Sequence, residues 1–368
     1  MRVSLKETDI IAPNFKKRFS GVTATIIQLI PYQRAHGIRI TALGPYLPND
    51  LPSLAWSALG GLWKRPLNNP FRLWHARRNV EMIVGIFMRD VLHMKLRLIF
   101  TSASQRYHQP FTKWLIRRMD RVIATSKHSG SYLEVPHQVI MHGIDLNRFT
   151  PPLTQEDTFK FSGLPGKYAV GCFGRIRYQK GTDLFVDAMI ELLPHYPEWT
   201  AIIAGRITLR HTVFARKLKD KISDAKLANR IIFIGELSDP CQWYRRLSLY
   251  VAPSRNEGFG LTPLEAMASQ TAVVTSDAGA YAECVARGTG TVVPASNQPV
   301  LQKAIEFYMA NPVQTITTGQ TALNHVRSAF PLIREATAIG AVYHDLWVKA
   351  GNHDNFRKKD INFLDPID

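Results

Sequence analysis

Short, nearly continuous apolar segments alternate with helical patterns along this 368-residue chain, and this alternation constrains its fold more than any other feature. Strands of a parallel sheet have such a composition, because helices cover both faces of the sheet and leave no face for polar side chains. The predicted strands are 9–13, 38–43, 81–87, 97–102, 121–126 and 137–143, followed by 168–174, 200–205, 230–235, 247–254, 271–276 and 290–295.

Amphipathic stretches, such as 22–36 and 110–119, lie between the predicted strands. This order predicts an α/β protein with two Rossmann-like, doubly wound domains. A segment rich in Pro, Gly and polar residues, 148–167, marks the break between them. We therefore expect domains at 1–152 and 166–330, followed by an amphipathic helix and a polar tail over 331–368.

The composition, with 45% hydrophobic and 20% charged residues, is that of an ordinary globular protein. The three cysteines are far apart and fit neither a disulfide framework nor a metal-ligand spacing, so we expect reduced, buried thiols. The N-terminus has no apolar signal region, and no uncharged apolar run reaches the ~18 residues of a membrane span. We expect the chain to reside on the cytoplasmic side.

The net charge of +17 is concentrated in the first half. Residues 1–150 contain 22 Lys and Arg but 8 Asp and Glu, whereas the remainder contains 24 and 21. The excess indicates either a solvated basic face or an anionic partner, phospholipid or nucleic acid. The basic clusters are interleaved with aromatic residues, which favours reversible docking of the first domain on a membrane. The residues involved are Lys16, Lys17, Arg18, Arg77 and Arg78, with Trp63, Phe71, Trp74 and Trp114.

The loops that follow predicted strands of the second half carry the chemistry expected of a phosphate site. Ligands of open parallel sheets bind at the carboxyl ends of the strands. There, Gly174 allows close approach, Arg175 offers a forked cation and Lys180 a point charge. The sequence lacks the Gly-x4-Gly-Lys-Ser/Thr pattern of a P-loop.

A second loop, 257–267 (EGFGLTPLEAM), places two glutamates eight residues apart. Thr262 and Pro263 predict the cap and first position of a helix, whose start is a favourable site for an anion. A pair of glutamates at this spacing is by itself typical of a solvated loop and helix face. Together with the Arg175–Lys180 loop, the segment predicts a phosphate site at one sheet edge.

These segments, with 141–151 (MHGIDLNRFTP), resemble the retaining glycosyltransferases of the GT-B fold that carry a Glu-x7-Glu motif. More narrowly, 10–31 and 99–108 resemble alphaproteobacterial lipopolysaccharide core mannosyltransferases. The resemblance implies a GT-B protein with a cleft between the domains. It also implies that the helix after 331 crosses back to the first domain.

The resemblance assigns roles to the motif residues. Glu257 would hold the hydroxyls of the transferred sugar, while Arg175 and Lys180 would stabilise charge on the leaving diphosphate. Glu265 would accept hydrogen bonds from the ribose. Because the protein supplies the cations, and no Asp-x-Asp motif lies beside a predicted strand, no metal and no cofactor are expected. Sugar and phosphate would also contact Gly174, Phe259, Gly260 and Leu261.

The first domain departs from the family pattern. The usual glycine pair near the N-terminus is a single Gly21, which remains a candidate for phosphate or acceptor contact. The family's donor-contacting histidine falls near Ala103 or Ser104; His108 either replaces it or is an ordinary surface histidine. Glu283, in the position of a family Gly-Gly-x-x-Glu turn, is expected to be structural rather than catalytic.

The implied activity is retaining hexosyl transfer, most specifically of mannose from GDP-mannose to the inner core of lipopolysaccharide. The expected partners are the nucleotide sugar, the anionic glycolipid acceptor and the cytoplasmic membrane surface, to which the enzyme would bind peripherally. One alternative is a glycosyltransferase that uses a UDP- or ADP-sugar. The other is a basic nucleic-acid-binding protein, although the sequence contains no recognisable nucleic-acid-binding module.

Overall fold

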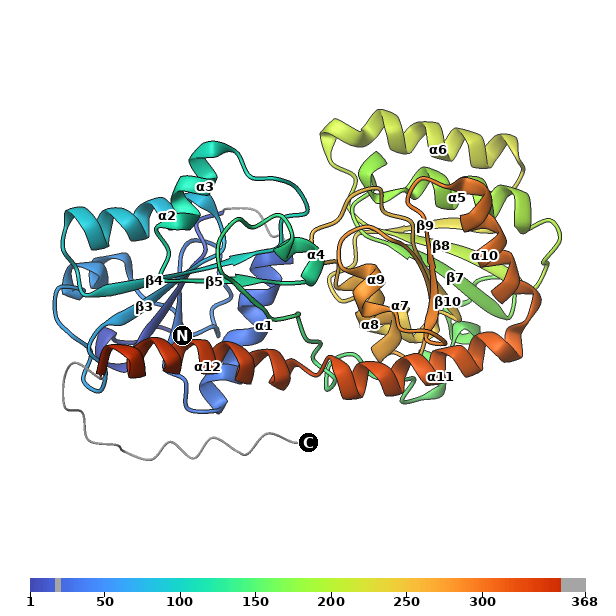
Figure 1. Cartoon of the computed structure of the whole chain (residues 1–368). Coiled ribbons are helices and arrows are strands. Elements are labelled where there is room, and N and C mark those ends of the chain that lie inside the picture. Colours follow the sequence, from blue (N-terminus) through green and yellow to red (C-terminus); the bar gives the residue numbers. More distant parts are fainter. Residues whose placement is uncertain (17–20, 352–368) are drawn as a thin grey trace.

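The structure, a computed structural model, describes residues 1–16 and 21–351, which form two parallel sheets of six strands each. Helices lie on both faces of each sheet (Figure 1), so the predicted pair of doubly wound domains is confirmed. The first sheet has the order β2 (Ile40–Leu43), β1 (Ile10–Pro13), β3 (Arg72–Ala76), β4 (Leu96–Ser102), β5 (Arg121–Ala124), β6 (Gln138–Val139). The second has the order β12 (Gly290–Val293), β11 (Ala272–Ser276), β10 (Leu249–Ala252), β7 (Tyr168–Phe173), β8 (Trp199–Ala204), β9 (Ile231–Gly235).

The helices connect these strands and cover the sheets. Those of the first domain are α1 (Gly21–Ala35), α2 (Asn79–Ile86), the π-helix η3 (Phe87–Val91), α3 (Pro110–Arg117) and α4 (Lys127–Gly130). Those that follow are α5 (Thr182–Leu192), α6 (Thr212–Asp224), α7 (Cys241–Arg246), α8 (Thr262–Ala268), α9 (Tyr281–Cys284), α10 (Gln298–Ala310), α11 (Pro312–Ala329) and α12 (Leu332–Gly351). Short 3₁₀ turns lie at Leu5–Glu7, Trp56–Gly61, Gln155–Asp157, Phe159–Ser162, Tyr178–Lys180 and Leu209–His211.

Successive residues of the buried strands point to opposite faces of the sheet and fill two separate cores. In β1, Ile10 belongs to a core formed with α1 and α12, whereas Ile11 belongs to the core beneath α2 and α3. In β7, Val170 packs toward α5 and Ala169 toward α8. This double coverage explains why the strands are apolar without interruption.

The predicted strand at 81–87 is wrong. These residues lie in α2, which continues as the π-helix η3. The neighbour of β1 in the sheet is instead β3, which lies inside the segment interpreted as a basic, aromatic surface cluster. A short apolar run does not distinguish a strand from a buried helix. In β3, the polar Arg and His residues interrupt the apolar run by which the other strands were recognised.

The aromatic residues of β3 and its approach belong to the core rather than the surface. Phe71 is 9% exposed and Trp74 is fully buried. Arg72 is also buried, and its Nε donates to the carbonyl oxygen of Thr8 at 3.0 Å. A buried guanidinium is tolerated because backbone carbonyls satisfy its donors. Phe71 and Trp74 therefore cannot contribute to a membrane anchor, contrary to the prediction.

The three cysteines, Cys172, Cys241 and Cys284, are buried and unpaired, as expected from their spacing. Burial raises the pKa of the Cys172 thiol to about 12, and burial together with Asp239 raises that of Cys241 to about 12. These thiols are therefore protonated and unreactive at neutral pH.

The helix α12 returns from the second domain and packs along α1 and the first sheet (Figure 1). At the crossing, Ile144 N–H donates to the carbonyl of Phe330 at 2.8 Å, and Leu332 N–H donates to the carbonyl of Ile144 at 3.0 Å. A Cβ on Gly143 would lie 2.6 Å from the Cα of Leu332, so only glycine lets the two connections pass this closely. The domain boundaries remain a prediction, and the tail 352–368 lies outside the described residues.

A buried histidine ties α12 to the first sheet. His75 of β3 is fully buried, with Nδ1 2.7 Å from the Tyr343 hydroxyl and Nε2 2.6 Å from the Thr101 hydroxyl. Burial, reinforced by the charge of Arg77, holds the pKa of His75 well below its ordinary value. The native state therefore keeps His75 neutral under conditions in which an unfolded chain would protonate it.

Stability should fall as the pH drops below about 6.5, because the unfolded chain then binds a proton that the native His75 excludes. This group alone contributes a slope of up to about 1.4 kcal/mol per pH unit. Denaturant titrations between pH 8 and pH 5 should show a shallower slope for His75→Gln, even if that variant is less stable throughout. His195→Gln, which alters an exposed histidine, should retain the wild-type slope. Identical slopes for all three proteins would contradict the assignment.

Candidate active site

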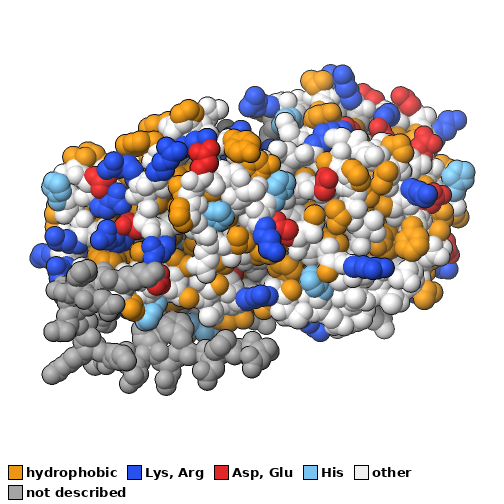
Figure 2. Space-filling view, viewed as in Figure 1, with side chains coloured by type: hydrophobic (Ala, Val, Ile, Leu, Met, Phe, Trp, Pro, Cys, Tyr) orange, Lys and Arg blue, Asp and Glu red, His pale blue; other side chains and the backbone are white. Residues whose placement is uncertain are grey.

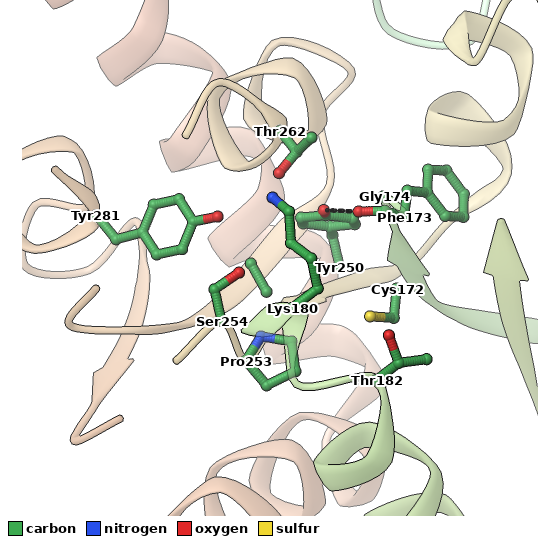
Figure 3. Close-up of a pocket in the computed structure, with 11 residues that line it drawn as sticks. Cys172, Phe173, Gly174, Lys180, Thr182, Tyr250, Pro253, Ser254, Thr262 and Tyr281 are labelled. Carbon is green, nitrogen blue, oxygen red and sulfur yellow. Dashed lines mark hydrogen bonds between the residues drawn. The ribbon is translucent and has the colours of Figure 1, made fainter. Parts of the chain in front are cut away.

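The strand order of the second sheet reverses between β7 and β10, where the chain turns to one side for β8 and β9 and to the other for β11 and β12. Loops that leave the carboxyl ends of two such strands diverge and open a crevice. Here they are the loop after β7, at 174–181, and the loop after β10, at 253–261. Both line a small pocket (Figure 3), in which the amine of Lys180 points toward the hydroxyls of Thr262 and Tyr281.

The two loops touch where Gly181 meets Pro253. Gly181 has a positive φ of 69°, and a Cβ there would lie 1.9 Å from the carbonyl oxygen of Pro253. Any side chain at this position would push the loops apart. The glycine that follows Lys180 is thus required for the lysine to reach the 253–261 loop.

Lys180 and Glu257 form a direct ion pair between the two loops, and each side chain is only 17% exposed. The Glu257 carboxylate also accepts a hydrogen bond from the backbone N–H of Gly258 at 3.2 Å and a long one from the Tyr281 hydroxyl at 3.5 Å. Burial would raise the pKa of Glu257, but Lys180, the backbone N–H of Gly258 and the charge of Arg177 outweigh it and leave the pKa below its usual value. Glu257 is therefore an ionised carboxylate held next to a cation.

The other cation of the predicted motif, Arg175, is exposed and directly follows Gly174, which lines the pocket. A third cation, Arg177, escaped the sequence analysis. Burial and the nearby charge of Arg175 lower the pKa of Arg177, whereas Glu257 acts in the opposite direction. Its Nε is buried without a hydrogen-bond partner among the described residues. Arg177 follows Arg175 by two residues in extended backbone, where side chains two apart point to the same side, and this spacing could have revealed it.

Glu265 lies in a different environment, inside α8. One carboxylate oxygen accepts a hydrogen bond from the Tyr244 hydroxyl of α7 at 2.8 Å. Burial raises the pKa of Glu265, and Tyr244, Arg148 and Lys180 offset only part of that effect. Burial, followed by Glu265 itself, raises the pKa of Tyr244 well above its ordinary value, so Tyr244 remains a hydrogen-bond donor.

The residues between the two glutamates can offer mainly their backbone. The Phe259 side chain is 5% exposed, with its ring 4.8 Å from that of His142. Gly260 has a positive φ of 88°, and Leu261 is half-buried. The helix begins one residue earlier than predicted: Leu261 is the cap, makes no side-chain capping bond, and Thr262 is the first helical residue. The Thr262 hydroxyl faces the pocket instead (Figure 3).

The two candidates in the first domain lie apart from this ion pair. Gly21 is the exposed first residue of α1, and a Cβ there would meet no atom within 4 Å. His108 shares a second small pocket with Lys113, Tyr132 and Glu134, all of the first domain. Burial, followed by the charges of nearby Arg106 and Lys113, lowers the pKa of His108.

Other residues of the first domain do reach the second. Gln105, in the loop after β4, donates from Nε2 to the carbonyl oxygen of Gly258 at 3.0 Å. A second contact between the domains involves Glu283 of the second domain. Its carboxylate accepts hydrogen bonds from the backbone N–H groups of Lys127 at 2.8 Å and His128 at 2.9 Å, at the start of α4. These contacts support the expected structural role of Glu283, whereas nothing in the sequence had singled out Gln105.

The described part of the chain contains no group of three or more His, Cys, Asp or Glu residues arranged to hold a metal ion. Within the same residues, no helix combines the length and apolar character needed to cross a membrane.

Comparison with known proteins places these features in a family. Residues 154–322 match the family described as glycosyl transferases group 1. The chain is 61% identical, over 93% of its length and 97% of the relative's, to the lipopolysaccharide core biosynthesis mannosyltransferase LpcC of Rhizobium leguminosarum bv. viciae. It is 52% identical, over 94% and 99%, to the corresponding mannosyltransferase LpsB of Rhizobium meliloti. In fold it is similar to HepE of Anabaena, solved with UDP and glucose, with a TM-score of 0.78 at 19% identity over 91% of this chain and 99% of that one.

Removing either cation of the predicted phosphate site should slow sugar transfer. We expect Arg175→Ala and Lys180→Ala each to lower turnover by about two to three orders of magnitude, as does the loss of one preorganised charge-stabilising group elsewhere. Initial rates of the purified variants, with folding verified by circular dichroism, provide the measurement. Lys167→Ala is the matched control, because Lys167 forms an exposed pair with Glu198. Near-normal rates in both site variants would rule out this phosphate site.

Proposed function

This chain belongs to the group 1 glycosyltransferases, in the family of the rhizobial lipopolysaccharide core mannosyltransferases, and on that premise we propose that it moves mannose from GDP-mannose to the lipopolysaccharide inner core with retention of configuration. The Lys180–Glu257 ion pair at the strand-order reversal is the observation that carries the proposal. It places a cation suited to a diphosphate directly beside a carboxylate suited to sugar hydroxyls.

Transfer breaks the bond between the anomeric carbon and the diphosphate, so negative charge develops on the leaving group. In this proposal Arg175 and Lys180 stabilise that charge, which would remove the need for a metal ion. When the donor enters, Lys180 would exchange Glu257 for phosphate oxygens, and Glu257 would turn to the sugar. Before the donor enters, the ion pair with Lys180 lowers the pKa of Glu257 and keeps its carboxylate ionised.

Glu265 is assigned to the ribose, as an acceptor of hydrogen bonds from its hydroxyls. Among the described contacts, Tyr244 engages only Oε2 of this carboxylate. The backbone amides of Phe259, Gly260 and Leu261, together with Gly174, complete the proposed donor site. In the first domain, Gly21 at the start of α1 is the proposed contact for phosphate or for the acceptor, and His108 is the candidate to replace the family's donor-contacting histidine.

A donor panel tests the proposal directly. We expect turnover of GDP-mannose with core lipid A as acceptor, and much slower or no turnover of UDP-glucose, UDP-galactose, UDP-N-acetylglucosamine and ADP-heptose. The product's anomeric configuration, determined by NMR, should match that of the donor. Efficient transfer from a UDP- or ADP-sugar would establish the alternative donor class. Protection from thermal unfolding by GDP, but not by DNA, would exclude the nucleic-acid alternative.

We further propose that the first domain docks on the cytoplasmic face of the membrane, on a surface that keeps the predicted Trp114 but not Phe71 or Trp74. Phe71 and Trp74 are core residues. Arg78 forms an ion pair with Glu81 at 2.7 Å, and burial lowers the pKa of Arg77, so neutralising these two would disturb the fold. Lys17 and Arg18 lie outside the described residues.

Exposed apolar side chains instead follow one edge of the first domain, over α2, η3 and α3 (Figure 2). Phe111 and Trp114 stack with ring centroids 5.9 Å apart, and the guanidinium of Arg118 lies 5.3 Å from the Trp114 ring. An aromatic pair beside exposed cations suits the interface of an anionic bilayer. The apolar residues are Val80, Ile83, Phe87, Val91, Phe111 and Trp114, each more than 40% exposed, and the neighbouring exposed cations include Arg97, Arg106, Arg117 and Arg118.

The double variant Phe111→Ser, Trp114→Ser should bind anionic vesicles about tenfold or more weakly, because two large apolar side chains no longer leave water. Sedimentation with phosphatidylcholine–phosphatidylglycerol vesicles at low and high salt measures the effect, and salt should weaken wild-type binding. Phe307→Ser is the matched control, since Phe307 is 52% exposed on α10 of the second domain. Absence of wild-type binding at low salt would refute docking and leave the basic surface only a steering role.

A further inference from the structure

The loop after β4 of the first domain contacts the main chain of the Glu257 loop across the domain boundary. Gln105 donates from Nε2 to the carbonyl oxygen of Gly258 at 3.0 Å, and the same Nε2 lies 3.5 Å from the Ser126 hydroxyl. The two loops also approach each other at Ala103, since a Cβ on Gly258 would lie 3.3 Å from the carbonyl oxygen of Ala103.

Gly258 is the residue that connects this contact to the ion pair. Its N–H donates to Oε1 of Glu257, and its carbonyl accepts from Gln105. The peptide next to Glu257 is therefore held from both domains. The second domain fixes the carboxylate through Lys180, and the first domain fixes the backbone that carries it.

Gln105 is half-buried, and its Oε1 is buried without a hydrogen-bond partner among the described residues. Enclosing an amide oxygen without a partner costs free energy. The side chain nevertheless directs its N–H group at Gly258, so the Gln105–Gly258 bond and the packing around it outweigh this cost.

We propose that Gln105 is a positioning residue, which holds the Glu257 loop from the opposite domain and so sets the position of the Glu257 carboxylate. The inference rests on the proposed role of Glu257 in sugar transfer. Gln105 acts through Gly258 and not by contact with the sugar, and its role is distinct from that of His108. A shift of the carboxylate by about 1 Å would be enough to slow transfer by about 100-fold.

Three substitutions separate positioning from general stability. Gln105→Glu keeps the shape but sets a carboxylate against the Gly258 carbonyl, Gln105→Ala removes the contact, and Gln105→Asn shortens it by one methylene. We expect kcat to fall about 10- to 100-fold for the Ala and Glu variants and less for Asn, with GDP affinity by calorimetry unchanged. Gln109→Ala, an exposed glutamine of the same loop, should keep wild-type kcat.

Gly258→Ala approaches the same contact from the other side and should also lower kcat. If both changes act through one contact, the effects of Gln105→Ala and Gly258→Ala should be less than additive in the double variant. Amide hydrogen exchange in the peptide covering 257–261 should become faster in Gln105→Ala and not in Gln109→Ala. This second measurement does not depend on turnover.

The donor panel on the wild-type enzyme separates this inference from the proposed function. If another sugar donor is used, the mannose assignment fails, and the Gln105 variants are compared with that donor. If Gln105→Ala and Gln105→Glu keep wild-type kcat and wild-type exchange at 257–261, the positioning role is overturned. A loss of GDP affinity in proportion to kcat would equally overturn it, since it would indicate damage to the whole site.

Discussion

The reversal of strand order within each sheet is the constraint on which the rest of this molecule depends. A parallel sheet buried on both faces cannot accommodate a ligand along its strands, so only the loops at the point of reversal are free to form a site. In the second sheet this point brings together Lys180 and Glu257. In the first sheet it lies between β1 and β3, where Arg78 donates to the Asn14 side chain at 2.8 Å.

The two glutamates of one loop differ because their surroundings differ. Glu257 faces a cation across the crevice and has a lowered pKa, whereas Glu265 sits in a helix against a tyrosine and has a raised one. If either Lys180 or Glu257 lost its partner, the remaining side chain would be a largely buried, uncompensated charge, which is costly. The donor proposed above would supply a partner to each of them, with diphosphate oxygens for the lysine and sugar hydroxyls for the carboxylate.

Much of this architecture could be predicted from the sequence, because the spacing of apolar residues along the chain indicates which side chains are buried. The prediction missed one strand, β3, because its composition does not match its environment. It contains Arg72 and His75, which are buried because backbone and hydroxyl groups satisfy them. The motif loops were recognisable because glycines and charges recur at fixed spacing. Gln105 was not, because its importance arises from a contact with Gly258, about 150 positions away, which no local pattern records.

The crossing at Gly143 and Leu332 also has a consequence for how the chain is made. One face of the first sheet is closed by Leu332, Ala336 and Ile339 of α12. The ribosome synthesises these residues only after the entire second domain. Until then α1 covers this face alone, and the part that α12 covers in the native structure stays exposed. Domains usually fold in the order of synthesis, but here the core of the first domain is completed only after the second domain has been synthesised. Until translation ends, this apolar surface is a place at which the nascent first domain can aggregate.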